Sequence, residues 1–175
     1  MPRGEAPIHY CDTSILRIAY KVGGNEDGTP VLLLHGWPDD ASTFDRVAPA
    51  LHRAGYRTFT PWLRGFGPTR FLSDNTVRSG EIAAMAQDAL DLADALGLAR
   101  FAIAGHDWGA RIAYWLASVF PERLTHCAAL SVAWEPGPLA TPAYLQAKAY
   151  WYQWFMATDG GAEAVRLEPS VCRRC

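Results

Sequence analysis

The segment Gly105-His106-Asp107-Trp108-Gly109 limits the fold more than any other part of this sequence. It lies between an apolar stretch that is typical of a buried strand and a stretch with apolar residues at helical spacing. Glycines placed two residues before and after an acidic residue favour a sharp strand-to-helix turn, because small residues let strand and helix pass closely. The central residue of such a turn is strained and lies at the helix N-terminus, where the helix dipole favours an ionised carboxylate. The pattern predicts an exposed Asp107 carboxylate, and the simpler alternative is that Asp107 only caps the helix.

Strand and helix signals alternate along the chain, which predicts the α/β class with a mostly parallel sheet and helices on both faces. Strands are expected at 15–22, 30–34, 56–62, 100–105 and 124–134. The apolar run at 30–34 is typical of a central strand covered on both faces, and the run at 124–134 is of the same buried type. Helices are expected at 42–54, with Ser42 as the N-cap, and at 81–96, 110–119 and 144–157.

A second motif, His35-Gly36-Trp37-Pro38, directly follows the apolar run at 30–34. Taken alone, it could be an ordinary turn. It precedes the Asp107 turn by about seventy residues, and the two motifs together are far more specific than either one alone.

HGWP followed by GHDWG resembles the epoxide hydrolases of the α/β-hydrolase fold superfamily and, more distantly, the haloalkane dehalogenases. The resemblance implies that Asp107 attacks an electrophilic carbon of a small hydrophobic substrate and forms an alkyl ester, which a histidine-activated water then hydrolyses. It also implies that the backbone N–H groups of Trp37 and Trp108 form an oxyanion hole. This chemistry needs no cofactor and no metal.

The remaining residues of the two motifs are expected to support this chemistry. The side chain of His35 makes a structural hydrogen bond, and Pro38, which has no N–H, shapes the loop. The side chain of His106 points away from the site in the fold that the resemblance implies. The small residues of the motifs are Gly36, Gly105 and Gly109.

A later aromatic segment separates the epoxide interpretation from the halide one. Residues 150–155 (YWYQWF), followed by Gly160-Gly161-Ala162-Glu163-Ala164, resemble the first cap helix of the epoxide hydrolases. By that match Tyr152 is a tyrosine whose hydroxyl stabilises the oxygen that is released when the epoxide ring opens. For the other aromatic residues, plain packing is the preferred interpretation: Tyr150, Trp151 and Trp154.

The resemblance also predicts the domain organisation. It assigns residues 1–135 to the N-terminal part of the hydrolase core and 136–166 to the beginning of a helical cap, and it leaves 167–175 as a tail unlike the family. No histidine follows His126, so we expect the chain to be incomplete at its C-terminus and inactive by itself. Three hypotheses follow: an incomplete copy of a working enzyme, an inactive remnant of the fold, or a non-catalytic binding protein.

Composition excludes several classes of function. The chain has 16 basic and 18 acidic residues and no basic run, which argues against nucleic acid and anionic membranes as partners. No apolar run is long enough for a signal peptide or a membrane span, so a cytoplasmic location is expected. The C-x-x-C at 172–175 lacks two further ligands for zinc. We expect self-association through an uncovered sheet edge at 124–134.

Overall fold

The computed structural model describes residues 7–132, 148, 151–156 and 158–167. The chain divides into two units, Met1–Trp134 and Glu135–Cys175, and each is described by itself. The predicted boundary between core and cap and the start of the helix predicted at 144–157 lie outside the described residues. The same holds for the tail predicted at 167–175, except for Leu167, which ends α6.

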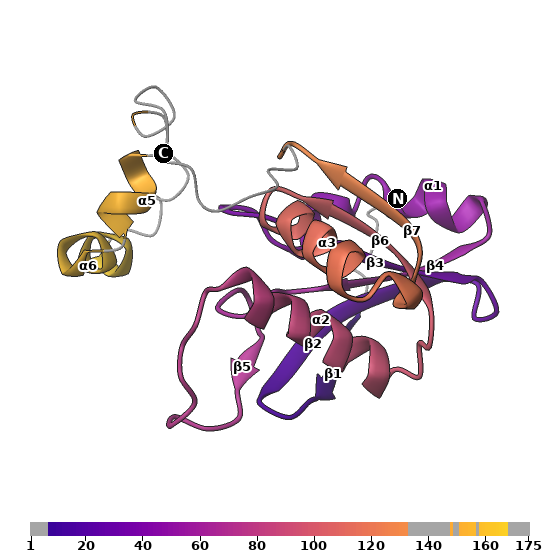
Figure 1. Ribbon diagram of the computed structural model, residues 1–175, viewed down its shortest axis with the longest axis horizontal. Helices are drawn as coiled ribbons and strands as arrows, with labels where there is room; N and C mark the ends of the chain where they lie inside the picture. Colours follow the sequence, from indigo (N-terminus) through magenta and orange to yellow (C-terminus); the bar gives the residue numbers. More distant parts are fainter. Residues whose placement is uncertain (1–6, 133–147, 149–150, 157, 168–175) are drawn as a thin grey trace. The chain divides into compact units, whose positions relative to one another are not determined.

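The first unit contains one mixed sheet whose central strands are parallel (Figure 1). The order is β1-β2-β4-β3-β6-β7, with β5 paired to β2. The pairs β4/β3, β3/β6 and β6/β7 are parallel, whereas β1, β4 and β5 each pair with β2 in antiparallel fashion. The strands are β1 (Ile8–Asp12), β2 (Leu16–Gly24), β3 (Thr29–Leu34), β4 (Tyr56–Pro61), β5 (Arg70–Phe71), β6 (Phe101–His106) and β7 (Leu124–Leu130). The predicted α/β class is confirmed, although the short strands β1 and β5 were not expected from the sequence.

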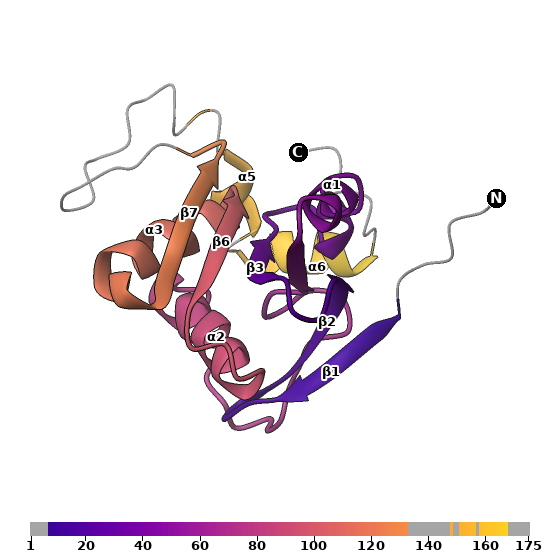
Figure 2. The same cartoon turned by 90° about the vertical axis from the view of Figure 1, so that its right-hand side faces the viewer.

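Helices cover both faces of this sheet, as predicted (Figure 2). The large apolar cluster joins the sheet to α2 and α3, and a smaller cluster on the other face joins it to η1 and α1. The helices of this unit are η1 (Ala41–Phe44, 3-10), α1 (Ala48–Arg53), α2 (Ile82–Ala95), α3 (Trp108–Val119) and η2 (Pro121–Arg123, 3-10). The second unit contributes α5 (Trp151–Met156) and α6 (Asp159–Leu167).

Strand β3 shows why a continuous apolar run is needed at the centre of the sheet. Successive side chains of a strand point to opposite faces, so Leu32 and Leu34 enter the cluster with α2 and α3 while Val31 and Leu33 enter the cluster with η1. All four are at most 5% exposed. Each such side chain contributes roughly 1.5–3 kcal/mol through burial, so the prediction of a strand buried on both faces is confirmed.

The helix predicted at 42–54 is wrong in its extent and in its cap. The segment forms the 3-10 turn η1 and then the separate helix α1. The N-cap of η1 is Asp40, whose carboxylate accepts a hydrogen bond from the Ser42 N–H at 2.7 Å. Pro49 lies in the first turn of α1, where a residue without an N–H is tolerated, and it would break a continuous helix through this segment.

The prediction for 124–134 is also wrong in part. Strand β7 ends at Leu130, and most of its side chains are exposed or half-exposed. The apolar composition is that of a buried strand, but burial depends on neighbours. Within the described residues β7 pairs only with β6 and packs on α3. Self-association through this edge stays a prediction.

A buried histidine ties the end of β3 to the end of β4. His35 is fully buried, and its Nε2 accepts a hydrogen bond from the Leu63 N–H at 3.1 Å. Because Nε2 accepts, Nδ1 carries the proton and donates to the Gly36 carbonyl at 2.9 Å. The edge of the Phe66 ring meets the imidazole at a centroid distance of 4.8 Å. The neutral ring thus positions two loops at once.

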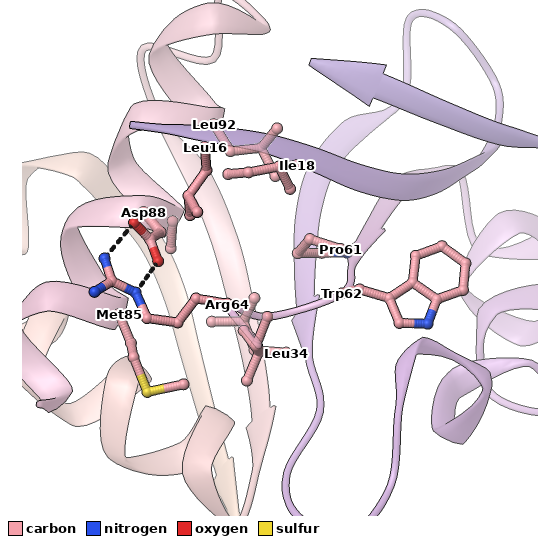
Figure 3. Close-up of a pocket in the computed structure, with 11 residues that line it drawn as sticks. Leu16, Ile18, Leu34, Pro61, Trp62, Arg64, Met85, Asp88 and Leu92 are labelled. Atoms are coloured by element: carbon pink, nitrogen blue, oxygen red, sulfur yellow. Dashed lines mark hydrogen bonds and ion pairs between the residues drawn. The ribbon is translucent and has the colours of Figure 1, made fainter. Parts of the chain in front are cut away.

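A buried ion pair anchors the loop after β4 to helix α2 (Figure 3). Arg64 donates from Nε and Nη2 to both carboxylate oxygens of Asp88 at 2.6 Å, and it also donates to the carbonyls of Ser79 and Ala84. Burial raises the pKa of the Asp88 carboxyl, whereas the bonds to Arg64 act to lower it. Trp62 points away from this pair in Figure 3. The loop is therefore anchored through Arg64.

Breaking this pair should cost far more than replacing it. Asp88→Asn leaves the Arg64 charge buried without its counter-ion, and the free energy of unfolding should fall by about 3–5 kcal/mol. The double variant Arg64→Met/Asp88→Leu removes both charges and should be less destabilised than the single variant. Urea unfolding followed by circular dichroism measures both. Equal losses in the two variants would show that the charges are not coupled.

The burial of His35 should make stability depend on pH. Burial lowers the pKa of its imidazole below the ordinary value of 6.5, against opposing effects of the Gly36 carbonyl and of Asp39 and Asp40. The folded state therefore binds fewer protons than the unfolded state just below that value. The stability that the neutral ring contributes is complete above pH 6.5 and is lost as the pH falls through the lowered pKa of the folded state. Urea titrations should show this loss, and His35→Gln should show a smaller one. Parallel curves for the two proteins would contradict the assignment.

Candidate active site

Asp107 adopts the strained backbone that its motif predicts. Its φ is 54° and its ψ is −111°, a combination that non-glycine residues rarely adopt. It immediately precedes α3, and its carbonyl accepts hydrogen bonds from Ala110 and Arg111 in the first turn. Its own N–H donates to the Leu130 carbonyl of β7 at 3.1 Å. The strain is thus held by backbone bonds on both sides of the residue.

The glycines of both motifs are required by contacts between backbones. A Cβ on Gly105 would collide with the Gly109 carbonyl, and a Cβ on Gly109 would collide with the Leu34 carbonyl. At Gly36 a Cβ would lie 2.5 Å from both Cβ and Oδ1 of Asp107. Because these three positions carry no side chain, β6, α3 and the loop after β3 can converge on one point. Larger residues would push these segments apart.

The convergence places the HGWP loop against the Asp107 carboxylate. The backbone N–H of Trp37 donates to Asp107 Oδ1 at 2.9 Å, a bond between residues 70 apart in the chain. The Gly109 N–H donates to the His35 carbonyl at 3.1 Å and fixes the loop to the start of α3. The peptide bond between Trp37 and Pro38 is cis. The two motifs, which the sequence analysis paired on pattern alone, are therefore in direct contact.

The other motif residues take distinct places around this contact. Trp108 is the first residue of α3, a position whose N–H has no carbonyl partner inside the helix. His106 ends β6 and is partly buried, and its Nδ1 has no hydrogen-bond partner among the described residues. Pro38 is exposed and follows Trp37 in the loop.

A pocket of about 340 Å³ adjoins the two tryptophans that flank Asp107. Its wall is mainly apolar and aromatic, as is usual for pockets that bind small molecules. The lining residues come from both motifs, from the loop after β4, from β5, from the segment before α2 and from α2 itself: Trp37, Arg64, Gly65, Phe66, Phe71, Arg78, Ser79, Gly80, Met85 and Trp108. Only the two tryptophans were candidates from the sequence. The others carry no local pattern that marks a binding wall.

Tyr152 belongs to the second unit. It lies on α5 and is partly buried, and the neighbouring Trp151 packs on Phe155 at a ring distance of 6.0 Å. Its role in ring opening stays a prediction. Tyr150 lies outside the described residues.

In the described parts of both units, no three histidine, cysteine, aspartate or glutamate side chains gather in a way that could hold a metal ion. In the same residues, no helix has the length and apolar character needed to cross a membrane.

Comparison with known proteins gives consistent results. The family model of the alpha/beta hydrolase fold matches residues 29–174. Epoxide hydrolase A of Mycobacterium tuberculosis is 34% identical over 122 residues, which cover 69% of this chain and 37% of that protein. Epoxide hydrolase 3 of Siraitia grosvenorii is 35% identical over 115 residues, which cover 66% of this chain and 36% of that protein. The chain thus spans about a third of the length of these curated relatives.

Solved structures agree with this result. A candidate epoxide hydrolase from Klebsiella pneumoniae superposes with a TM-score of 0.86 and 38% identity, covering 95% of this chain and 57% of that one. The family model covers most of the chain, and the solved structure has the same fold. The chain therefore belongs to the α/β-hydrolase fold family, and the relatives that it resembles are named as epoxide hydrolases.

Proposed function

We propose that this chain carries the nucleophile half of an epoxide hydrolase, with Asp107 as the residue that forms the alkyl ester. One carboxylate oxygen attacks an epoxide carbon, the ring C–O bond breaks, and the ring oxygen leaves as an alkoxide that takes up a proton. A carboxylate suits this step because it is nucleophilic without a base to deprotonate it. The substrate is a small hydrophobic epoxide, in keeping with the apolar wall beside Asp107.

The hydrogen bond from the Trp37 N–H to Asp107 Oδ1 is the observation that carries the proposal. In the ester, one Asp107 oxygen bears the alkyl group and the other is the carbonyl oxygen. When water attacks that carbonyl, negative charge develops on the oxygen that an N–H donor must hold. The Trp37 N–H is already directed at an Asp107 oxygen, and the Trp108 N–H, at the start of α3, is the proposed second donor.

Ester hydrolysis needs a base that activates water. His126 is the last histidine of this sequence. We infer that the chain alone does not turn over epoxides, because losing a base of this kind costs about four to six orders of magnitude. The epoxide interpretation is preferred to halide release because the relatives are named as epoxide hydrolases and because Tyr152 offers a hydroxyl for the alkoxide.

The nucleophile can be tested in a chimera in which residues 1–166 replace the matching part of the Klebsiella protein. Single turnover of styrene oxide in heavy-oxygen water should place the label in the Asp107 carboxylate, because water attacks the ester carbonyl. Mass spectrometry of the peptide that contains Asp107 detects it. Asp107→Ala should lose diol formation by about 10⁴-fold. Label found only in the diol would mean direct attack by water and would refute the assignment.

Tyr152 can be tested in the same chimera. Tyr152→Phe should slow alkylation by about tenfold to a thousandfold, since one donor to developing charge is removed. Hydrolysis of the ester should be almost unchanged, because the ring oxygen does not react in that step. Trp151→Phe on the same helix is the matched control and should affect neither step selectively. Equal slowing of both steps by Tyr152→Phe would assign the residue to packing.

A further inference from the structure

The pocket that adjoins the two motifs contains an arginine. Trp37 and Trp108 of the motifs line it together with Phe66, Phe71 and Arg78. The guanidinium carbon of Arg78 lies 4.1 Å from the centre of the Phe71 ring. A flat apolar group that packs on Phe71 in this pocket would therefore lie close to a positive charge.

Of the described residues that line this pocket, Arg64 and Arg78 carry charge and none is acidic. The Arg64 charge is already compensated, because both oxygens of Asp88 bind it in the core. Arg78 differs in that its side chain is 48% exposed and its ion-pair partner Asp74, at 3.6 Å, is fully exposed. An ion pair of that kind contributes little in water, so Arg78 remains attractive to another anion.

Arg78 is also held in place. Its Nη1 donates to the carbonyls of Ser73 at 3.1 Å and Thr76 at 2.8 Å, and its guanidinium lies over Phe71. An anion would thus meet a guanidinium that is already positioned, so less side-chain freedom is lost on binding. The anion must lie at the far end of the ligand from the reacting carbon, because the Asp107 carboxylate would repel it.

We propose that this pocket selects substrates with an aromatic arm that ends in a carboxylate, which pairs with Arg78. The aromatic ring packs on the wall formed by Phe66, Phe71 and the two tryptophans. The proposal rests on the proposed function, since it names the substrate class of the same site. It concerns binding, and the attack by Asp107 is a separate step.

An inert pair of ligands tests this without any reaction. 4-Ethylbenzoate and 4-ethylbenzamide share the ring and the ethyl group and differ in charge, and their affinities for the full chain can be measured by NMR titration. The benzoate should bind about threefold to tenfold more tightly, the range expected for one charge-assisted bond at a half-exposed position. Added salt should reduce this preference.

Variants identify the arginine. Arg78→Gln should abolish the preference for the benzoate and leave binding of the benzamide almost unchanged. Arg78→Lys, which keeps the charge, should retain part of the preference. Arg70→Gln removes a neighbouring charge that does not line the pocket and should retain all of it. The proposal is overturned if neither ligand binds the original chain, if the preference is absent or insensitive to salt, or if it survives Arg78→Gln.

These outcomes are separate from those that test the nucleophile. A missing label on Asp107 would refute the proposed chemistry and leave the charge preference measurable. Loss of the charge preference would refute the substrate class and leave the ester at Asp107 intact.

Discussion

The close approach of three backbone segments at Asp107 is the constraint on which the rest of this structure depends. Strand β6, the start of α3 and the loop after β3 meet where Gly105, Gly109 and Gly36 leave no room for a Cβ. Because the segments touch, the Trp37 N–H reaches the Asp107 carboxylate, and the left-handed backbone at Asp107 is maintained. Strain of this kind persists only where surrounding contacts fix it. The sheet and helices supply those contacts.

Two buried polar groups connect the segments around Asp107 to the rest of the first unit. His35 joins the loop after β3 to Leu63, and Arg64, the next residue, joins the loop after β4 to helix α2 through Asp88. Buried polar groups are costly unless they are satisfied, and here each one accepts or donates hydrogen bonds to distant segments. The cost of burial is thus offset by bonds that set the position of the HGWP loop relative to the pocket wall.

The same anchoring explains why two arginines in one pocket differ in character. Arg64 has its counter-ion in the core and serves the fold. Arg78 is attached to its loop through two carbonyls and is half-exposed beside a fully exposed aspartate, so its charge is not compensated in the core. Proteins that share one such strand-to-helix turn can vary what they bind through loops of this kind, because loops change without disturbing the turn itself.

The sequence by itself determined the strained turn at Asp107, the HGWP loop, the alternation of strands and helices, and the strand at 30–34 that is covered on both faces. These features depend on local geometry: glycine at a tight turn, apolar residues at a fixed period, and proline at a loop. The end of helix α2 before Gly97, whose φ is 71°, belongs to the same group.

Only the tertiary structure decided the rest. The segment at 42–54 divides because Asp40 caps a short turn and Pro49 begins a new helix, and β7 is exposed because burial depends on what lies beside a strand. The pairing of Arg64 with Asp88 and the pocket wall join residues that are far apart in sequence. No local pattern encodes such contacts, because their energy exists only once the chain has brought the partners together.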